Sequence, residues 1–119
     1  MNKNYLFALV LAIPFLFTQC KKDAVETFDC VGISPTYTTD VKTILDVRCA
    51  TTGCHSAASK SEGIDLSSYT GAKSASSKAD FLGAIQHKSG YKAMPQGSAK
   101  LDDATIKILS CWVQNGSPQ

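Results

Sequence analysis

The sequence lacks several features that would assign the chain to a large class of proteins. It has no apolar run of the roughly 20 residues that a membrane-spanning helix requires; the run at positions 5–17 has 13 residues and is interrupted by Pro14. It lacks a strong charge of either sign, because 12 basic and 10 acidic residues give a net charge of +2, so nucleic acid is not an expected partner. It also lacks the alternating pattern of strands and any internal repeat. These absences leave one small helical domain within 119 residues.

The first 19 residues have the features of a signal peptide that is removed on export. Lys3 supplies the positive charge, and the run at 5–17 supplies the apolar core. Cys20 follows, and a cysteine directly after a short apolar core resembles the acylated N-terminus of a mature bacterial lipoprotein. Residues 17–19 lack the usual small residue, so an ordinary signal peptide cleaved nearby is the alternative. Both interpretations predict export, and the first predicts a periplasm-facing or cell-surface lipoprotein anchored in a membrane through Cys20.

The mature chain is expected to consist of a tether and one domain. We expect residues 20–38 to form a lipid-anchored linker and residues 39–119 to form the domain. Export places this chain in an oxidising compartment, where disulfides persist. The 81 residues beyond the tether form only a marginal apolar core, so the domain would benefit from a covalent staple or a large buried cofactor.

Apolar spacing predicts a short helix that leads directly into Cys49. Thr39 or Asp40 is placed to cap its N-terminus. The serine-rich stretch 56–77 contains two glycines, which favours a loop over a long helix. The expected buried stripe of the first helix is Val41, Ile44 and Leu45.

Two further helices are expected in the C-terminal half of the chain. A short one covers 80–86, and a longer one begins at Asp102 or Asp103 and is stopped by Gly116. Their expected apolar side chains are Phe81, Leu82, Ile85, Ile106, Leu109, Trp112 and Val113.

Two thiols and an imidazole lie within seven residues at positions 49–55, where the sequence reads Cys-Ala-Thr-Thr-Gly-Cys-His. Cys49 and Cys54 have the chemistry to add across the two vinyl groups of haem as thioethers, and His55 could bind the iron from the proximal side. The usual attachment signature has two residues between the cysteines, whereas this one has four. The four are small, and Gly53 can adopt a positive φ, so a longer loop is sterically feasible. A local disulfide between the two cysteines is the alternative.

Two side chains could supply a second iron ligand. Met94 lies 39 residues after His55, between polar residues and before Pro95, whereas a methionine that fills a core gap is expected on an apolar stripe. A thioether ligand favours ferrous iron and raises the reduction potential. His87 is the alternative distal ligand and would give a bis-histidine haem of lower potential. We expect Met94 to bind, because His87 lies at the exposed end of a short helix, where a solvated histidine is usual.

Cys30 and Cys111 are the cysteines that these roles leave over. In an exported protein they predict a disulfide that joins the N-terminal linker to the final helix. Closing a loop of some 80 residues would stabilise the fold by about 4 kcal/mol in the chain-entropy model. Two buried free thiols are the alternative.

Together these pieces resemble the monohaem c-type cytochromes, above all the small exported bacterial cytochrome c domains. The resemblance covers positions 40–116, from the helix that leads into the cysteine motif, through the methionine–proline loop, to a final helix that contains Trp112 and precedes an Asn-Gly pair. It implies an all-α fold of three to five short helices around one covalent haem c. It also implies an electron carrier, not an enzyme, that exchanges electrons with redox partner proteins. The family roles fall on Cys49, Cys54, His55 and Met94.

Other interpretations of the same residues remain open. A zinc site formed by Cys49, Cys54, His55 and His87 would make the protein a metal-binding module. A haem-free lipoprotein stabilised by disulfides would act as a binding module. A haem enzyme or gas sensor would need an open sixth position on the iron, which Met94 would fill. Six lysines against three acidic residues in 60–100 predict either a basic rim that attracts acidic redox partners or a scattering of solvated charges.

Overall fold

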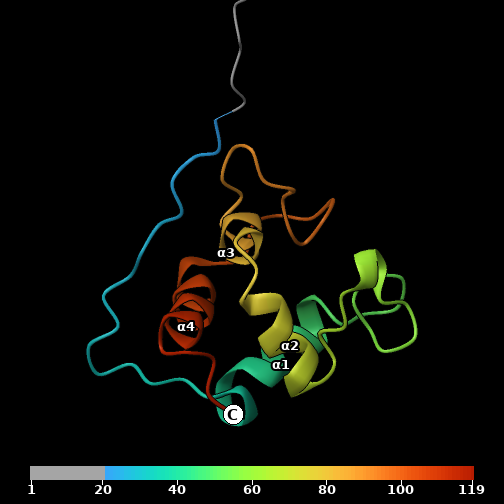
Figure 1. Cartoon of the computed structure of the whole chain (residues 1–119), viewed down its shortest axis with the longest axis horizontal. Helices are drawn as coiled ribbons and strands as arrows, with labels where there is room; N and C mark the ends of the chain where they lie inside the picture. The colour runs from blue at the N-terminus through green and yellow to red at the C-terminus, as the bar shows by residue number, and fades with distance from the viewer. Residues whose placement is uncertain (1–20) are drawn as a thin grey trace, which may run out of the picture.

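The computed structural model describes residues 21–119, which form helices and no strand (Figure 1). The prediction of an all-α domain is therefore confirmed for this part of the chain. The predicted signal peptide, residues 1–19, and the predicted lipidation site, Cys20, lie outside the described residues. None of the described helices is long and apolar enough to span a membrane. The elements in chain order are the π-helical turn η1 (Tyr37–Val41), α1 (Lys42–Arg48), the 3-10 turn η2 (Ser61–Gly63), α2 (Tyr69–Ser76), α3 (Asp80–Ile85) and α4 (Asp103–Gln114).

The first helical segment begins three residues earlier than the sequence suggested. The cap is Thr36, whose side-chain oxygen accepts a hydrogen bond from the backbone N–H of Thr39. The backbone N–H of Thr36 donates in turn to the carboxylate of Asp40, at 2.8 Å. These reciprocal bonds satisfy N–H groups that have no partner inside the helix. The segment continues without a break into α1 and ends at Cys49, which confirms that a helix leads directly into the first cysteine.

The serine-rich stretch contains a helix, α2, where the sequence favoured a loop. Ser68 caps it by accepting a hydrogen bond from the N–H of Gly71. Its buried face consists of Ala72, Ala75 and Ser76, so the prediction was wrong because small side chains form this face in place of the large ones that mark a stripe. Gly71 fits closely, since a Cβ built at this position would lie 2.0 Å from the carbonyl oxygen of Asp65.

Helix α4 supplies the centre of the core. Asp102 caps it by accepting a hydrogen bond from the N–H of Thr105, at 2.9 Å. Its inward face is fully buried and ends in Trp112, whose indole N–H donates to the carbonyl of Pro118 at 2.8 Å. The ring of Tyr37 in η1 packs against this indole with a centroid separation of 6.4 Å. The large side chains of the core are Tyr37, Val41, Leu45, Leu66, Ile85, Leu101, Ile106, Leu109 and Trp112.

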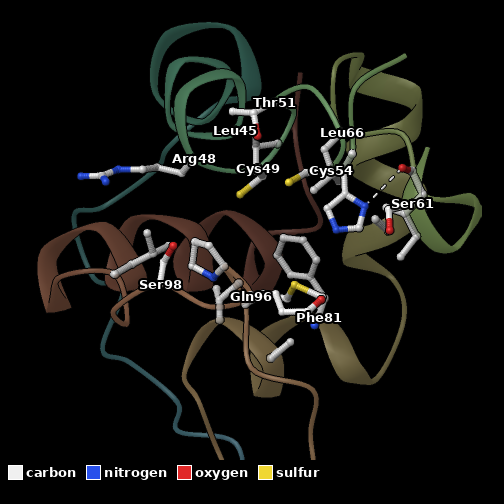
Figure 2. A pocket seen from close by; sticks show the side chains of 18 of the residues that line it. Leu45, Arg48, Cys49, Thr51, Cys54, Ser61, Leu66, Phe81, Gln96 and Ser98 are labelled. Carbon is white, nitrogen blue, oxygen red and sulfur yellow. Dashed lines mark hydrogen bonds between the residues drawn. The ribbon is translucent and has the colours of Figure 1, made fainter. Parts of the chain in front are cut away.

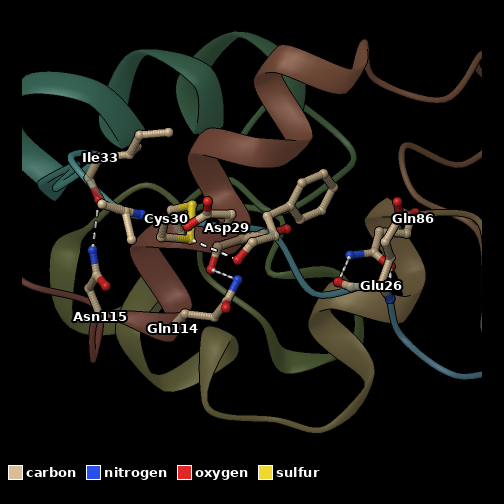
Figure 3. The surroundings of a disulfide bond; sticks show 11 residues. Glu26, Asp29, Cys30, Ile33, Gln86, Gln114 and Asn115 are labelled. Atoms are coloured by element: carbon tan, nitrogen blue, oxygen red, sulfur yellow. Dashed lines mark hydrogen bonds between the residues drawn. A yellow bond between two sulfur atoms is a disulfide. The ribbon is translucent and has the colours of Figure 1, made fainter.

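The N-terminal segment, residues 22–36, lies along the domain and is fixed to it at several points. A disulfide joins Cys30 to Cys111 in α4, with 5.5 Å between their Cα atoms (Figure 3). Glu26 and Gln86 exchange two hydrogen bonds, and Asn115 donates to the carbonyl of Ile33 (Figure 3). The segment that the sequence suggested as a linker therefore connects the end of α3 to α4.

Candidate functional site

A cavity of about 790 Å³ lies between α1, α3, α4 and the two loops at 49–55 and 92–101 (Figure 2). This volume is in the range of sites that enclose a whole cofactor or drug-sized ligand. Most of its wall is apolar. The apolar lining side chains include Leu45, Val47, Ile64, Leu66, Ala75, Phe81, Ala84, Ile85, Ala99, Leu101 and Leu109.

The loop that carries both cysteines and the histidine is closed by its own backbone. The N–H of Cys49 donates to Leu45 in the last turn of α1, and the N–H of His55 donates back to the carbonyl of Cys49, at 3.1 Å. Between them Gly53 adopts a φ of +81°, a conformation that glycine tolerates without steric cost. The four-residue spacer therefore folds into a compact loop with Cys49, Cys54 and His55 on the cavity wall.

Cys49 and Cys54 are free thiols, so the local disulfide that the sequence left open is not formed. Burial raises the pKa of Cys49 to about 11, and the neighbouring Cys54 acts in the same direction, whereas Arg48 opposes the rise. Cys49 is therefore a neutral thiol near neutral pH. Because metals bind the thiolate, zinc ligation by Cys49 would first have to remove this proton.

His55 is 9% exposed and is held in one orientation. Its Nδ1 lies 3.3 Å from the carbonyl oxygen of Ile64, and its own carbonyl accepts a hydrogen bond from the N–H of Leu66, at 2.8 Å. A carbonyl only accepts, so the Nδ1 contact is a hydrogen bond in the tautomer that carries its proton on Nδ1. That tautomer leaves a lone pair on Nε2, the arrangement that is usual for a histidine bound to a metal.

Met94 lines the same cavity from the loop that follows α3. Its backbone N–H donates to the carbonyl of Ala84 in α3, at 3.0 Å. Figure 2 shows the neighbouring Gln96, together with Phe81, across the cavity from Cys49 and Cys54. The structure therefore brings the four residues with predicted haem contacts to one cavity from two segments far apart in the sequence.

His87, the alternative distal ligand, does not line the cavity. Its Nε2 lies 3.0 Å from the backbone carbonyl oxygen of Met94. It also lies apart from the cysteine loop, and within residues 21–119 no three His, Cys, Asp or Glu side chains gather as a metal-binding group.

Charged side chains also line the cavity, and both signs are present. Of the six lysines in 60–100, three contribute to the lining, together with Arg48. Lys92 pairs with Glu62 at 3.5 Å, which joins the methionine loop to η2. The other lysines, at 60, 73 and 88, contact side chains elsewhere. The charged lining residues are Arg48, Lys78, Lys92, Lys100, Glu62, Asp80 and Asp102.

Sequence reasoning identified part of the apolar wall and missed the rest. Ile44 and Trp112 belong to the expected apolar faces of their helices, but neither lines the cavity, and Trp112 packs against Tyr37 in the core. Leu101 and Ala84 were missed because they stand outside any expected large apolar stripe.

Comparison of the chain with protein-family models, curated protein sequences and solved structures found no significant match.

Proposed function

We propose that the protein is an electron carrier that holds one covalent haem c in this cavity. Cys49 and Cys54 provide the thioether links, His55 the proximal ligand and Met94 the distal ligand. The observation that carries the proposal is the convergence of these four side chains on one largely apolar cavity. Iron in such a site exchanges single electrons, and the protein supplies ligands, orientation and exclusion of water.

The residues present fit this group in their donor set. His55 offers Nε2 while its Nδ1 is held by Ile64, and Met94 offers a thioether from a backbone that is hydrogen-bonded to α3. The apolar wall suits a macrocycle that is itself apolar over most of its area. One imidazole and one thioether complete the axial set of an electron carrier and leave no open position for substrate.

The free thiols also fit. When a thiol adds across a vinyl group, sulfur forms a bond to one carbon and its hydrogen goes to the other, so no oxidant is consumed. The cysteines that would be needed for attachment are thus the two that the fold leaves unpaired, whereas Cys30 and Cys111 are joined to each other.

We also propose export and anchoring through Cys20, with redox proteins as partners. The disulfide is compatible with an oxidising compartment. The cavity lining contains four basic and three acidic side chains, and this small positive excess suits a partner with acidic groups.

The test is the intact mass and visible spectrum of the protein exported from a host with haem-maturation machinery. We expect the mass of one covalent haem and a ferric charge-transfer band between sulfur and iron. Met94→Ala should abolish the band and keep the haem, whereas Cys49→Ala with Cys54→Ala should lose covalent attachment. No haem mass, in a host where a control cytochrome matures, would refute the proposal, and bound zinc in that protein would identify the metal-binding alternative.

A further inference from the structure

His87 has a backbone and a side chain that both depart from the usual end of a helix. It follows the last residues of α3 and adopts a φ of +52°, in the left-handed region that non-glycine residues rarely occupy. Histidine is one of the residues that tolerate this conformation best, but it remains less favourable than the right-handed one. The turn directs the half-buried ring toward the loop that carries Met94, and not toward solvent as the sequence suggested.

Both backbone polar groups of Met94 are bound to this end of α3. Its N–H donates to the carbonyl of Ala84, at 3.0 Å. Its carbonyl oxygen lies 3.0 Å from Nε2 of His87, and since a carbonyl only accepts, the imidazole donates. The first bond is between backbone groups and does not depend on which side chain stands at 87. The second is the only one of the two that a substitution at 87 removes.

We propose that His87 is a positioning residue, which holds the peptide of Met94 so that its thioether stays at the cavity. This inference rests on the proposed haem function and assigns a role to the histidine that haem ligation leaves unused. The donor nitrogen of His87 is occupied by the carbonyl of Met94. Loss of that bond frees one side of the Met94 peptide to rotate, which lowers the fraction of molecules with the methionine in place.

The experiment compares wild type and variants for the concentration of added imidazole that displaces Met94 from the ferric iron. Displacement is measured as the loss of the sulfur-to-iron charge-transfer band. His87→Gly removes the ring and accepts a positive φ, so it isolates the side chain from backbone strain. His87→Gln keeps an N–H donor of similar reach. Glutamate has nearly the same shape as glutamine but has no donor at neutral pH, so His87→Glu is the matched variant without the donor. Lys88→Ala is the control, because the adjacent Lys88 side chain pairs with Glu26 and its backbone bond to Gly83 is retained.

Half-displacement of Met94 should need roughly three- to tenfold less imidazole in His87→Gly and His87→Glu than in wild type, the range that one net hydrogen bond supports. His87→Gln and Lys88→Ala should stay within about twofold of wild type. The inference is overturned if His87→Gly and His87→Glu need as much imidazole for half-displacement as Lys88→Ala. It is also overturned if imidazole displaces Met94 from His87→Gln as readily as from His87→Glu, because the ring would then act by packing and not through its N–H donor. Should His87→Gly fail to fold, the Gln and Glu pair decides.

Failure of the proposed function gives a different result. A wild-type protein without covalent haem, or with haem but without the sulfur band, contradicts the His/Met assignment before any variant is made. A wild-type protein with the band and unaffected His87 variants contradicts only the positioning role.

Discussion

Removal of the disulfide between Cys30 and Cys111 should cost a large part of the stability of the domain. The bridge joins residues 81 apart in the sequence. In the chain-entropy model a closed loop of this length restricts the unfolded chain by about 4.5 kcal/mol at 25 °C. The free energy of unfolding of small domains is about 5–15 kcal/mol. The loss therefore approaches the whole stability of the domain if its free energy of unfolding lies at the lower end of this range. The two segments that the bridge joins also retain non-covalent contacts, such as that between Asn115 and Ile33.

The assay is urea unfolding of the protein as exported, followed by the fluorescence of its single, fully buried tryptophan, Trp112. The double variant Cys30→Ala with Cys111→Ala should unfold with about 3–4.5 kcal/mol less free energy than the oxidised wild type, and its m-value should be larger because its unfolded chain is not cross-linked. Wild type reduced with a thiol is the matched comparison, since it keeps both sulfur atoms in the buried site. A loss below about 1 kcal/mol in both forms would refute the loop-entropy reasoning.

Three further outcomes follow from single contacts. Gly71→Ala should lower the free energy of unfolding by about 1–3 kcal/mol because its methyl group meets the carbonyl of Asp65; urea unfolding measures the loss, and a variant as stable as wild type contradicts the close fit. Asp102→Ala should lower the melting temperature at pH 7, and the difference from wild type should disappear at low pH. The hydrogen bonds from Thr105 lower the pKa of Asp102 below 3.8. The stabilisation by Asp102 is therefore present above pH 3.8 and is lost as the pH falls through the lowered pKa. In haem-free protein, alkylation of Cys49 should be slow at pH 8 and should accelerate until about pH 11, and mass mapping that finds no acceleration over this range contradicts the raised pKa.

The sequence predicted elements whose signals are local. The helix before Cys49, the helix at 80 and the final helix all carry large apolar residues at helical spacing, and the structure contains α1, α3 and α4 at these places. Helix α2 was missed because its buried face is made of alanine and serine, which are too small to stand out in a polar stretch. The early start of the first segment was missed because Thr36 and Asp40 form their cap across a π-helical turn, whose longer spacing differs from that of an ordinary helix.

The site was predictable in its chemistry but not in its surroundings. Cys49, Cys54 and His55 are neighbours in the sequence, and Met94 was found by elimination, so no knowledge of the fold was needed to list them. The partners of His55 and His87 are backbone carbonyls, at Ile64 and Met94. Any residue provides a carbonyl, so no residue type marks these contacts in advance. They depend on loop paths that only the folded chain fixes.

The two sides of the cavity are supported by different parts of the chain. On one side Cys49 is the direct continuation of α1, which is packed against the core through Leu45. On the other side Met94 depends on the end of α3, a helix of only six residues that cannot hold itself in place. The N-terminal segment supplies the missing support, since Glu26 is bonded to Gln86 beside His87, and Cys30 fixes the same segment to α4. The disulfide therefore stabilises the methionine side more than the cysteine side, and its reduction should loosen Met94 before it affects the residues that attach the haem.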